Sequence, residues 1–272
     1  MNYKYAALFV LFNPSEEEIK QVINFSKLYD AVYVYDNSEK VADYKKELIE
    51  NEILYYGFES NDGLSKAYNF IIKKALEKNY DWLSIYDQDS IITEQMVSQL
   101  KTYVENASIN TIASVVPAIQ YSEKSIVSDN SIEVAWAINS GQMINLKLLI
   151  ENNIWFDENI FLDRVDRDFC KQVELANLKI IQVGGAILWQ HLGEKYKGFN
   201  VHSPLRNYYM MKNRLYYNHK YCGQNKAFLL NCLQSTKHIV NILRSHYKII
   251  ENMQMIRRAY CDYKMNKMGK IL

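Results

Sequence analysis

Proline and glycine are scarce in this chain of 272 residues, which contains three Pro and nine Gly. A content this low excludes collagen-like and Pro/Gly-rich disordered proteins. The four cysteines form no CxxC pair and no disulfide-rich pattern, so reduced thiols in a cytoplasmic protein are expected. No basic-then-apolar leader opens the sequence, and no apolar run approaches the roughly 18 residues that a membrane span requires.

The residues that are abundant indicate a globular protein with a large core. Hydrophobic residues make up 49% of the chain and aromatic residues 13%, which suits one large domain or one domain with an appendage. Residues 1–194 carry 17 Lys and Arg against 29 Asp and Glu, whereas residues 195–272 carry 15 against 2. The basic tail indicates an anionic partner: a phosphate-bearing ligand, a membrane surface or the acidic front of the same chain. No motif indicates nucleic acid.

Apolar β-type runs alternate with amphipathic helical segments along the chain. Strands are expected at 3–12, 31–38, 52–58 and 81–86, with helices after a Ser15–Glu18 capping box and after the Asn61-Asp62-Gly63 turn. The pattern then predicts a helix at 93–106, a strand at 111–119, and two strands and a helix within 135–151, with a turn at Ser140-Gly141. The pattern of residues 156–194 predicts a helix and then a strand that ends at His191. From residue 203 onward the pattern predicts helices. The order predicts an α/β fold with a mostly parallel sheet.

Polar clusters follow three of the expected strands at the point where each strand ends. They are Asn13, the run Asp36-Asn37-Ser38 and the run Asp87-Gln88-Asp89. Ligands of such sheets bind outside the carboxyl ends of the strands, so these clusters are expected to meet along one edge.

Asp87 and Asp89 lie two residues apart directly after a buried strand, and like charges this close repel each other. A hard divalent cation, Mg²⁺ or Mn²⁺, would offset the repulsion and bind the phosphate oxygens of a substrate. The alternative is that both are solvated turn residues.

Eight segments resemble, in order and spacing, the motifs of inverting GT-A glycosyltransferases of family 2, and among them the bacterial rhamnosyltransferase-like members. The resemblance runs from about residue 6 to residue 217. The segments are FNP (12–14), DNS (36–38), NDGLSKAYN (61–69), YDQDS (86–90), NSGQMIN (139–145), FDENIFLDRVDRDFC (156–170), QHLGE (190–194) and RNYYMMKNRL (206–215).

The resemblance implies a Rossmann-like GT-A domain over residues 1–202, with a nucleotide-sugar half (1–110) and an acceptor half (111–202). It also implies a role for each matching residue. Asp89, with Asp87 and His191, would hold the cation. The donor would contact Asn13, Asp36, Asn61, Gly63, Asp87 and Gln88. The transferred sugar and acceptor would lie over Asn139, Ser140 and Gly141, and the diphosphate under Arg206 with Lys212 or Arg214.

Two positions depart from the family pattern. Val165 precedes Asp166 where many members have Glu-Asp, but the rhamnosyltransferase-like branch also lacks that Glu. Lys212 stands where an Arg is common, and a Lys neutralises phosphate without a bidentate fork.

An inverting transfer needs a base that accepts the proton of the acceptor hydroxyl. The run DRVDRD offers Asp163, Asp166 and Asp168, and the family position favours Asp166, with Asp163 second. The segment also begins a helix, where acidic residues are favoured without any catalytic role.

The tail 203–272 keeps apolar residues at helical spacing with Lys and Arg between them. Three interpretations stay open: packing on the catalytic domain, a homodimer face, and peripheral attachment to the inner face of an anionic membrane.

The sequence therefore predicts a metal-dependent inverting transferase that moves L-rhamnose from dTDP-L-rhamnose to a saccharide or lipid-linked acceptor of bacterial surface polysaccharide. A UDP-hexose or UDP-galactofuranose donor is an alternative. From other classes, YDQDS also resembles the nucleophile loop of haloacid-dehalogenase-type phosphatases, and a non-catalytic glycosyltransferase-like scaffold is a further interpretation.

Overall fold

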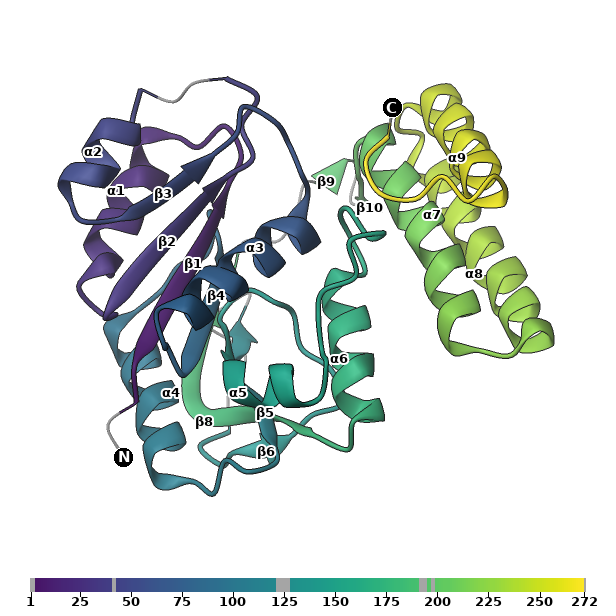
Figure 1. Ribbon diagram of the computed structural model, residues 1–272. Helices are drawn as coiled ribbons and strands as arrows, with labels where there is room; N and C mark the ends of the chain where they lie inside the picture. Colours follow the sequence, from purple (N-terminus) through teal and green to yellow (C-terminus); the bar gives the residue numbers. More distant parts are fainter. Residues whose placement is uncertain (1–2, 41–42, 121–127, 191–194, 197–198, 272) are drawn as a thin grey trace.

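A computed structural model describes residues 3–40, 43–120, 128–190, 195–196 and 199–271 of the chain. One eight-stranded sheet, in the order β3-β2-β1-β4-β7-β5-β8-β6, forms its centre (Figure 1). The strands are β1 (Tyr5–Leu11), β2 (Ala31–Asp36), β3 (Leu54–Gly57), β4 (Trp82–Asp87), β5 (Ile112–Gln120), β6 (Ile132–Glu133), β7 (Gln142–Asn145) and β8 (Lys179–Trp189). A separate two-stranded sheet joins β9 (Lys195–Tyr196) to β10 (Phe199–Asn200).

The first four strands in the sheet order are parallel to one another, as the sequence predicts. β7 lies antiparallel between β4 and β5, and β8 is again parallel to β5. The sheet is therefore mixed and mostly parallel. All seven residues of β1 are buried, because helices cover both of its faces.

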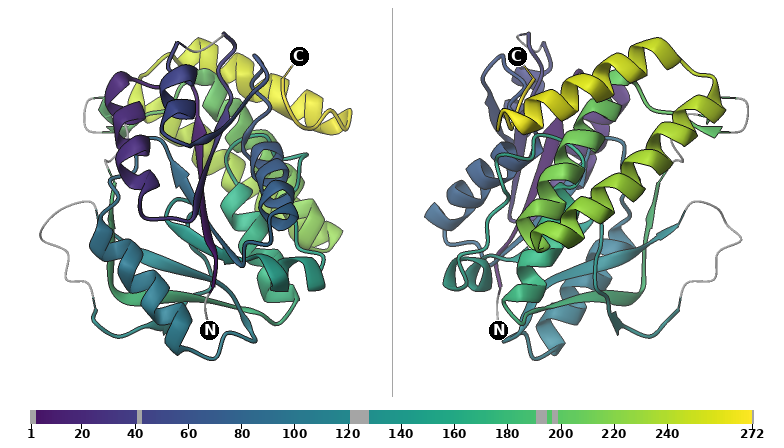
Figure 2. Two further views of the ribbon diagram at one scale, coloured as in Figure 1. Left: turned by 60° about the vertical axis from the view of Figure 1, so that its left-hand side comes forward. Right: turned by 90° about the vertical axis from the view of Figure 1, so that its right-hand side faces the viewer.

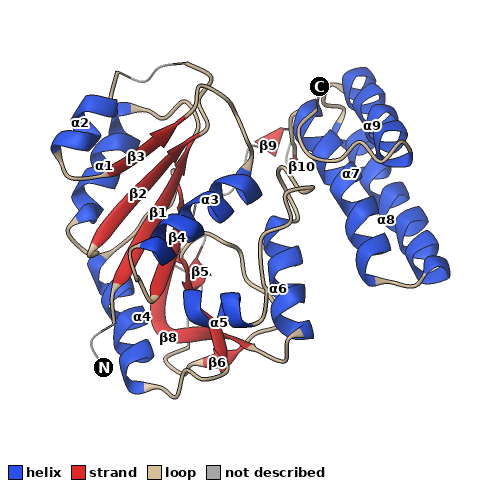
Figure 3. Ribbon diagram, in the orientation of Figure 1, coloured by secondary structure: helices blue, strands red, loops and turns tan. Residues whose placement is uncertain are grey.

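Helices pack on the two faces of the sheet in two groups. On one face α1 (Glu16–Ser26), α2 (Lys45–Glu50) and α4 (Glu94–Asn106) contribute to a cluster around Phe9 and Val34. On the other face α3 (Leu64–Glu77), α5 (Leu146–Glu151) and α6 (Val165–Leu175) contribute to a cluster around Leu8 and Tyr33 (Figure 3). Successive side chains of β1 point to opposite faces of the sheet. Its apolar residues are therefore shared between the two clusters.

Some elements differ from the sequence-based expectation. The first strand expected within 135–151 is wrong: residues 135–139 form an irregular segment, because β7 occupies the place beside β4 where a strand pairs. The six-residue helix α2, with Leu48 buried, was not predicted. β8 ends at Trp189, and His191 lies outside the described residues.

Three helices follow the sheet domain and pack together at one side of it (Figures 1 and 2). They are α7 (Pro204–Tyr221), α8 (Gln224–Ser245) and α9 (Ile249–Lys264). Their shared apolar cluster includes Phe161, whose ring stacks on Tyr209 with 4.8 Å between centroids. In the described part of the chain, no helix has both the length and the apolar character to cross a membrane.

The last residues of the chain return from α9 to the sheet domain. Buried Lys212 donates to the carbonyl oxygens of Lys267 (3.4 Å) and Gly269 (2.8 Å). The Gly269 amide donates to the Asn159 carbonyl oxygen at 2.9 Å, and Lys270 pairs with Glu39 at 3.2 Å. The C-terminal segment therefore bridges the helical tail and the sheet domain.

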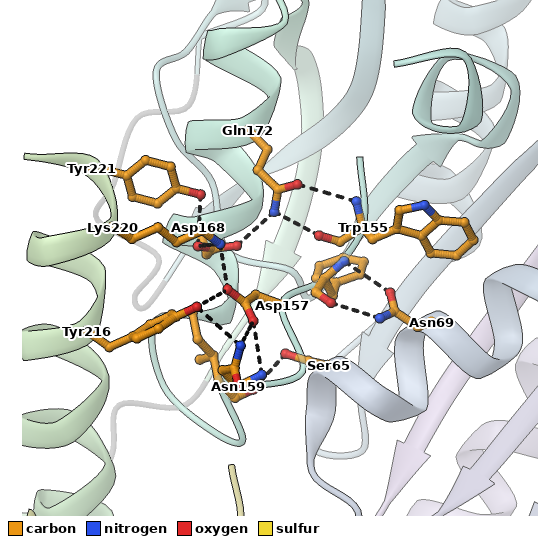
Figure 4. Close-up of polar contacts among 12 residues, drawn as sticks. Ser65, Asn69, Trp155, Asp157, Asn159, Asp168, Gln172, Tyr216, Lys220 and Tyr221 are labelled. Atoms are coloured by element: carbon orange, nitrogen blue, oxygen red, sulfur yellow. Dashed lines mark hydrogen bonds and ion pairs between the residues drawn. The ribbon is translucent and has the colours of Figure 1, made fainter. Parts of the chain in front are cut away.

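An ion-pair network also joins α7 to the sheet domain (Figure 4). The Lys220 ammonium lies 2.6 Å from an oxygen of half-buried Asp157 and 2.7 Å from an oxygen of buried Asp168. Tyr216 donates to Asp157 and Tyr221 donates to Asp168. Burial of the Asp168 carboxylate is tolerated because a cation and a hydroxyl lie beside it.

Lys220→Met is expected to lower the free energy of unfolding by about 1–3 kcal/mol, because buried Asp168 and half-buried Asp157 lose their cation. Hydrogen bonds from Lys220 and Tyr216 hold the pKa of Asp157 below its usual 3.8, against the effect of its burial. This stabilisation is present above pH 3.8 and is lost as the pH falls through the lower pKa, so the difference between variant and wild type should shrink in acid. Denaturant titration at several pH values measures it.

Lys147→Met is the control, because the Lys147 side chain is 80% exposed and should change stability by less than about 0.5 kcal/mol. A loss below about 1 kcal/mol for Lys220→Met would contradict a structural role for the network.

Candidate active site

A cavity of about 820 Å³ opens at the carboxyl ends of β1 and β4. Hydrogen bonds bring the three predicted polar clusters together there: the Asn13 amide donates to the Ser38 hydroxyl at 2.8 Å, and the Phe12 amide donates to the Gln88 side chain at 2.7 Å. Predicted site residues that line the cavity are Asn61, Gly63, Asp87, Gln88, Asp89, Asn139, Asp163, Asp166 and Arg206.

The loop after β4 presents Asp87 and Asp89 to this cavity. The Asp87 amide donates to the Ser140 hydroxyl at 3.3 Å, and Ser140 is also hydrogen-bonded to Ser90. Ser140 is buried, so it supports the carboxylate loop from beneath. The Gly141 amide donates to the Ile85 carbonyl oxygen at 2.8 Å, which fixes the same turn to β4.

Negative charge accumulates in the cavity. Burial, with Asp89 and Asp166 nearby, raises the pKa of Asp87 to about 6, and Arg206 offsets this only in part. Carboxylate oxygens in such excess fit a hard divalent cation, which would relieve the repulsion among them. Within the described residues, no group of three or more His, Cys, Asp or Glu side chains comes together as a metal site.

The wall opposite this loop is the segment Phe161–Asp166, which begins α6. Asp163 and Arg164 are consecutive residues with positive φ, at 57° and 72°. A positive φ is unfavourable for residues other than glycine, and it persists where surrounding contacts hold the backbone in place. Buried Asn213 of α7 holds it here, since its amide donates to the carbonyl oxygens of Leu162 and Asp163. Sequence analysis missed Asn213, although it lies within the RNYYMMKNRL segment.

The three aspartates that were candidates for a base occupy different environments. Asp166 and Asp163 line the cavity, and burial raises the pKa of both. Asp163 also pairs with Arg206 at 3.4 Å. Asp168 is 1% exposed and is held by Lys220, so its carboxylate belongs to the network beneath α7 and not to the cavity.

Several predicted contact residues lie behind the cavity surface. Asp36 is buried and accepts hydrogen bonds from the hydroxyls of Tyr44 (2.8 Å) and Tyr55 (2.7 Å). Lys212 holds the C-terminal segment, as described above, so its ammonium is engaged away from the cavity. Arg214 donates to the Gln234 carbonyl oxygen at 3.0 Å, inside the helical tail. Of the cationic residues predicted to cover a diphosphate, Arg206 is the one that lines the cavity.

Tyr68 is a cavity residue that sequence analysis did not single out. Its hydroxyl and the side-chain oxygen of Asn139 are buried, and the two side chains lie close enough to interact. Burial, with Asp87 and Asp166 nearby, raises the pKa of Tyr68 well above 10, so the hydroxyl stays protonated. Tyr68 therefore contributes a neutral side chain to the cavity wall.

Comparison with solved structures identifies the fold as GT-A, the fold of a large class of nucleotide-sugar transferases. TarS from S. aureus superimposes with a TM-score of 0.56 at 15% identity, covering 94% of this chain and 43% of that one. GalNAc-T7, solved with UDP, GalNAc and Mn²⁺, gives a TM-score of 0.60 at 12% identity, covering 77% of this chain and 47% of that one. The chain thus spans less than half the length of either neighbour.

A shorter form of TarS, residues 1–349 in complex with UDP, gives a TM-score of 0.54 at 15% identity, with 96% of this chain and 72% of that one covered. Among curated proteins, the dTDP-rhamnosyl transferase RfbF of Shigella flexneri is 26% identical over 241 residues, which is 78% of this chain and 79% of the relative. A scan against protein-family models found no match. These comparisons confirm the predicted fold and the resemblance to GT-A glycosyltransferases of the rhamnosyltransferase-like group.

Gly63→Ala is expected to lower the free energy of unfolding by about 1–3 kcal/mol and to displace the cavity wall. Gly63 has φ of +80°, and an added Cβ would lie 2.6 Å from the Phe161 carbonyl oxygen, which accepts a hydrogen bond from the Leu64 amide. Thermal or denaturant unfolding of the purified variant measures the loss.

Gly223→Ala is the matched control, since nothing lies within 4 Å of the Cβ that it adds, and its effect should stay below about 1 kcal/mol. Equal effects of the two substitutions would show that the contact with Phe161 does not constrain this turn.

Proposed function

We propose that this protein is a metal-dependent inverting glycosyltransferase that moves L-rhamnose from dTDP-L-rhamnose to a saccharide or lipid-linked saccharide acceptor in bacterial surface polysaccharide synthesis. The observation that carries the proposal is the pairing, in one cavity, of the Asp87–Asp89 loop with Asp166 on the opposite wall. The first supplies oxygen ligands for a cation and the second supplies a base, which are the two requirements of this transfer.

Asp89 and Asp87 are the proposed ligands of the cation, which is Mn²⁺ or Mg²⁺. When bound, such a cation neutralises charge on a leaving diphosphate. Arg206, which lines the cavity and pairs with Asp163, would add a second positive charge for the phosphates. GalNAc-T7 was solved with Mn²⁺ and UDP, which supports a divalent ion in a site of this fold.

Asp166 is the proposed base. Its carboxylate would accept the proton of the acceptor hydroxyl while the hydroxyl oxygen attacks the anomeric carbon and the bond from that carbon to the diphosphate breaks. Attack on the face opposite the leaving group inverts the configuration, and no covalent enzyme intermediate forms. Asn139, which lines the cavity, would orient a sugar hydroxyl between the base and the cation ligands.

The donor is the least constrained part of the proposal. Support for dTDP-L-rhamnose is the similarity to a dTDP-rhamnosyl transferase over most of both chains. The two structural neighbours solved with UDP keep a UDP-sugar donor as a second candidate.

Calorimetric titration of the protein with dTDP and with UDP, each in Mn²⁺, Mg²⁺ or EDTA, should show metal-dependent binding with dTDP preferred. Asp89→Asn should weaken that binding by roughly 100-fold or more, because loss of even an outer partner of a metal ligand costs 10–100-fold. Asp129→Asn is the control, since Asp129 is exposed and is not among the residues that line the cavity.

Preferential UDP binding would retain the fold and chemistry and overturn the assigned sugar. Failure of both nucleotides to bind in the presence of either metal would favour a non-catalytic scaffold.

Asp166→Asn should lower kcat by about 10²–10⁴-fold while leaving dTDP affinity within a few-fold of wild type, because a base acts on the acceptor and not on the nucleotide. Burial raises the pKa of Asp166 above the usual 3.8, so the wild-type rate should fall on the acid side at a higher pH than an ordinary aspartate would give. Initial rates of transfer across pH measure both effects.

Asp163→Asn is the companion variant. If it loses this acid limb and Asp166→Asn keeps it, the base is Asp163 and the assignment is wrong.

A further inference from the structure

The structure divides the apolar residues of the tail into two sets that the sequence pattern alone does not separate. Ile242 and Ile256 lie inside the cluster that joins α7, α8 and α9. A second set on α8 is exposed to solvent: Leu229 (59%), Leu233 (60%), Val240 (37%) and Leu243 (44%). The second set therefore does not stabilise the helical tail by packing within it.

The exposed set forms one continuous line along α8. With Thr236 between them, the residues 229, 233, 236, 240 and 243 follow the spacing i, i+4, i+7, i+11 and i+14, which lies along one face of a helix. α8 is 22 residues long, and Figure 1 shows it beyond α7, on the side away from the sheet. An apolar face of this length on an outer helix indicates a binding surface.

A groove of about 400 Å³ between α7, α8 and α9 adjoins this line. Phe228, 69% exposed, and Tyr260, 51% exposed, lie at it, together with Arg257 and Lys264. The apolar surface of α8 therefore continues toward α9, where its neighbours are again cationic.

The charges beside the line have a single sign. Lys226, Lys237 and Arg244 lie on α8 within one helical turn of the exposed aliphatic residues, and all three are exposed. α8 contains no Asp or Glu. Basic side chains next to an apolar line are the features with which an interfacial helix binds an anionic bilayer.

A second copy of this chain fits the same surface less well. Aliphatic residues spaced alternately by three and four positions would suit pairing of two helices. Helices that pair in this way, however, carry oppositely charged residues beside the line of contact. Here Lys237 and Arg244 lie beside it, and two copies of α8 would bring cations together without any carboxylate from either helix.

We propose that the exposed face of α8, with its flanking Lys and Arg residues, binds the surface of an anionic lipid bilayer. The aliphatic side chains would lie at the level of the acyl-chain boundary and the cations among the headgroup phosphates. Because Leu205, Arg206 and Tyr209 of α7 line the cavity, the helical unit that binds lipid also forms a wall of the proposed active site. If the proposed transfer is correct, this arrangement keeps a lipid-linked acceptor close to the cavity.

Flotation of the full chain with vesicles tests the proposal. Vesicles of phosphatidylcholine with about 30% phosphatidylglycerol should carry the protein, and pure phosphatidylcholine should not, with binding weakened in 0.5 M salt. The triple variant K226E/K237E/R244E should partition at least roughly 100-fold more weakly, since each cation near such a surface contributes about fivefold. The double variant L233Q/L243Q should also bind more weakly.

Matched controls separate the surface from overall charge and from folding. K20E/K46E/K147E makes the same change in net charge at lysines whose side chains are 67%, 85% and 80% exposed in the sheet domain, and should bind vesicles like wild type. Leu175→Gln, at a residue 61% exposed on α6, is the apolar control.

Equal loss of binding in the two charge variants would overturn the assigned surface. Absence of binding to anionic vesicles would overturn the proposal itself, as would a concentration-dependent dimer in sedimentation that L233Q/L243Q abolishes. Nucleotide binding is measured on the same samples, so failure of the vesicle test is distinguishable from failure of the proposed transfer.

Discussion

The packing of Phe161 is the interaction on which the cavity depends. Its carbonyl oxygen accepts the amide of Leu64 at the start of α3, its ring occupies the space that a side chain on Gly63 would need, and the ring also stacks on Tyr209 of α7. One residue thus joins α3, the acidic segment and the helical tail. The positive-φ backbone at Asp163 comes two residues later and is held by Asn213.

Repulsion among the carboxylates is a second constraint on the cavity. Burial, together with the nearby carboxylates of Asp89 and Asp166, raises the pKa of Asp87, and Arg206 offsets this only in part. By contrast, half-buried Asp157 and buried Asp168 lie nearby along the chain, and Lys220 neutralises them. The chain therefore contains one acidic cluster with its own cation and another that, in the proposed function, a bound cation and substrate would compensate.

Local signals were sufficient to predict most of the sheet and the meeting of the polar clusters at one edge of it. The Ser15–Glu18 capping box, the β-branched strands and the carboxylates after β4 all act over a few residues, and each is found where the pattern indicates. The segment 135–139 was wrongly predicted as a strand because β4, about 50 residues earlier in the chain, pairs with β7 instead, and local propensity does not report that choice. Likewise, the roles of Asp168, Lys212 and Arg214 depend on partners 20 to 57 residues away, which spacing along the chain does not reveal.

The return of the C-terminal segment has a consequence for the order in which the molecule is completed during synthesis. Domains begin to fold as they emerge from the ribosome, and every strand of the large sheet precedes residue 190. The Lys270–Glu39 pair, however, joins residues 231 positions apart, and Lys212 finds its carbonyl partners only when residues 267–269 arrive. The sheet is thus able to form co-translationally, whereas α7 acquires its last contacts, and the cavity its finished wall, only once residues 267–270 have been synthesised.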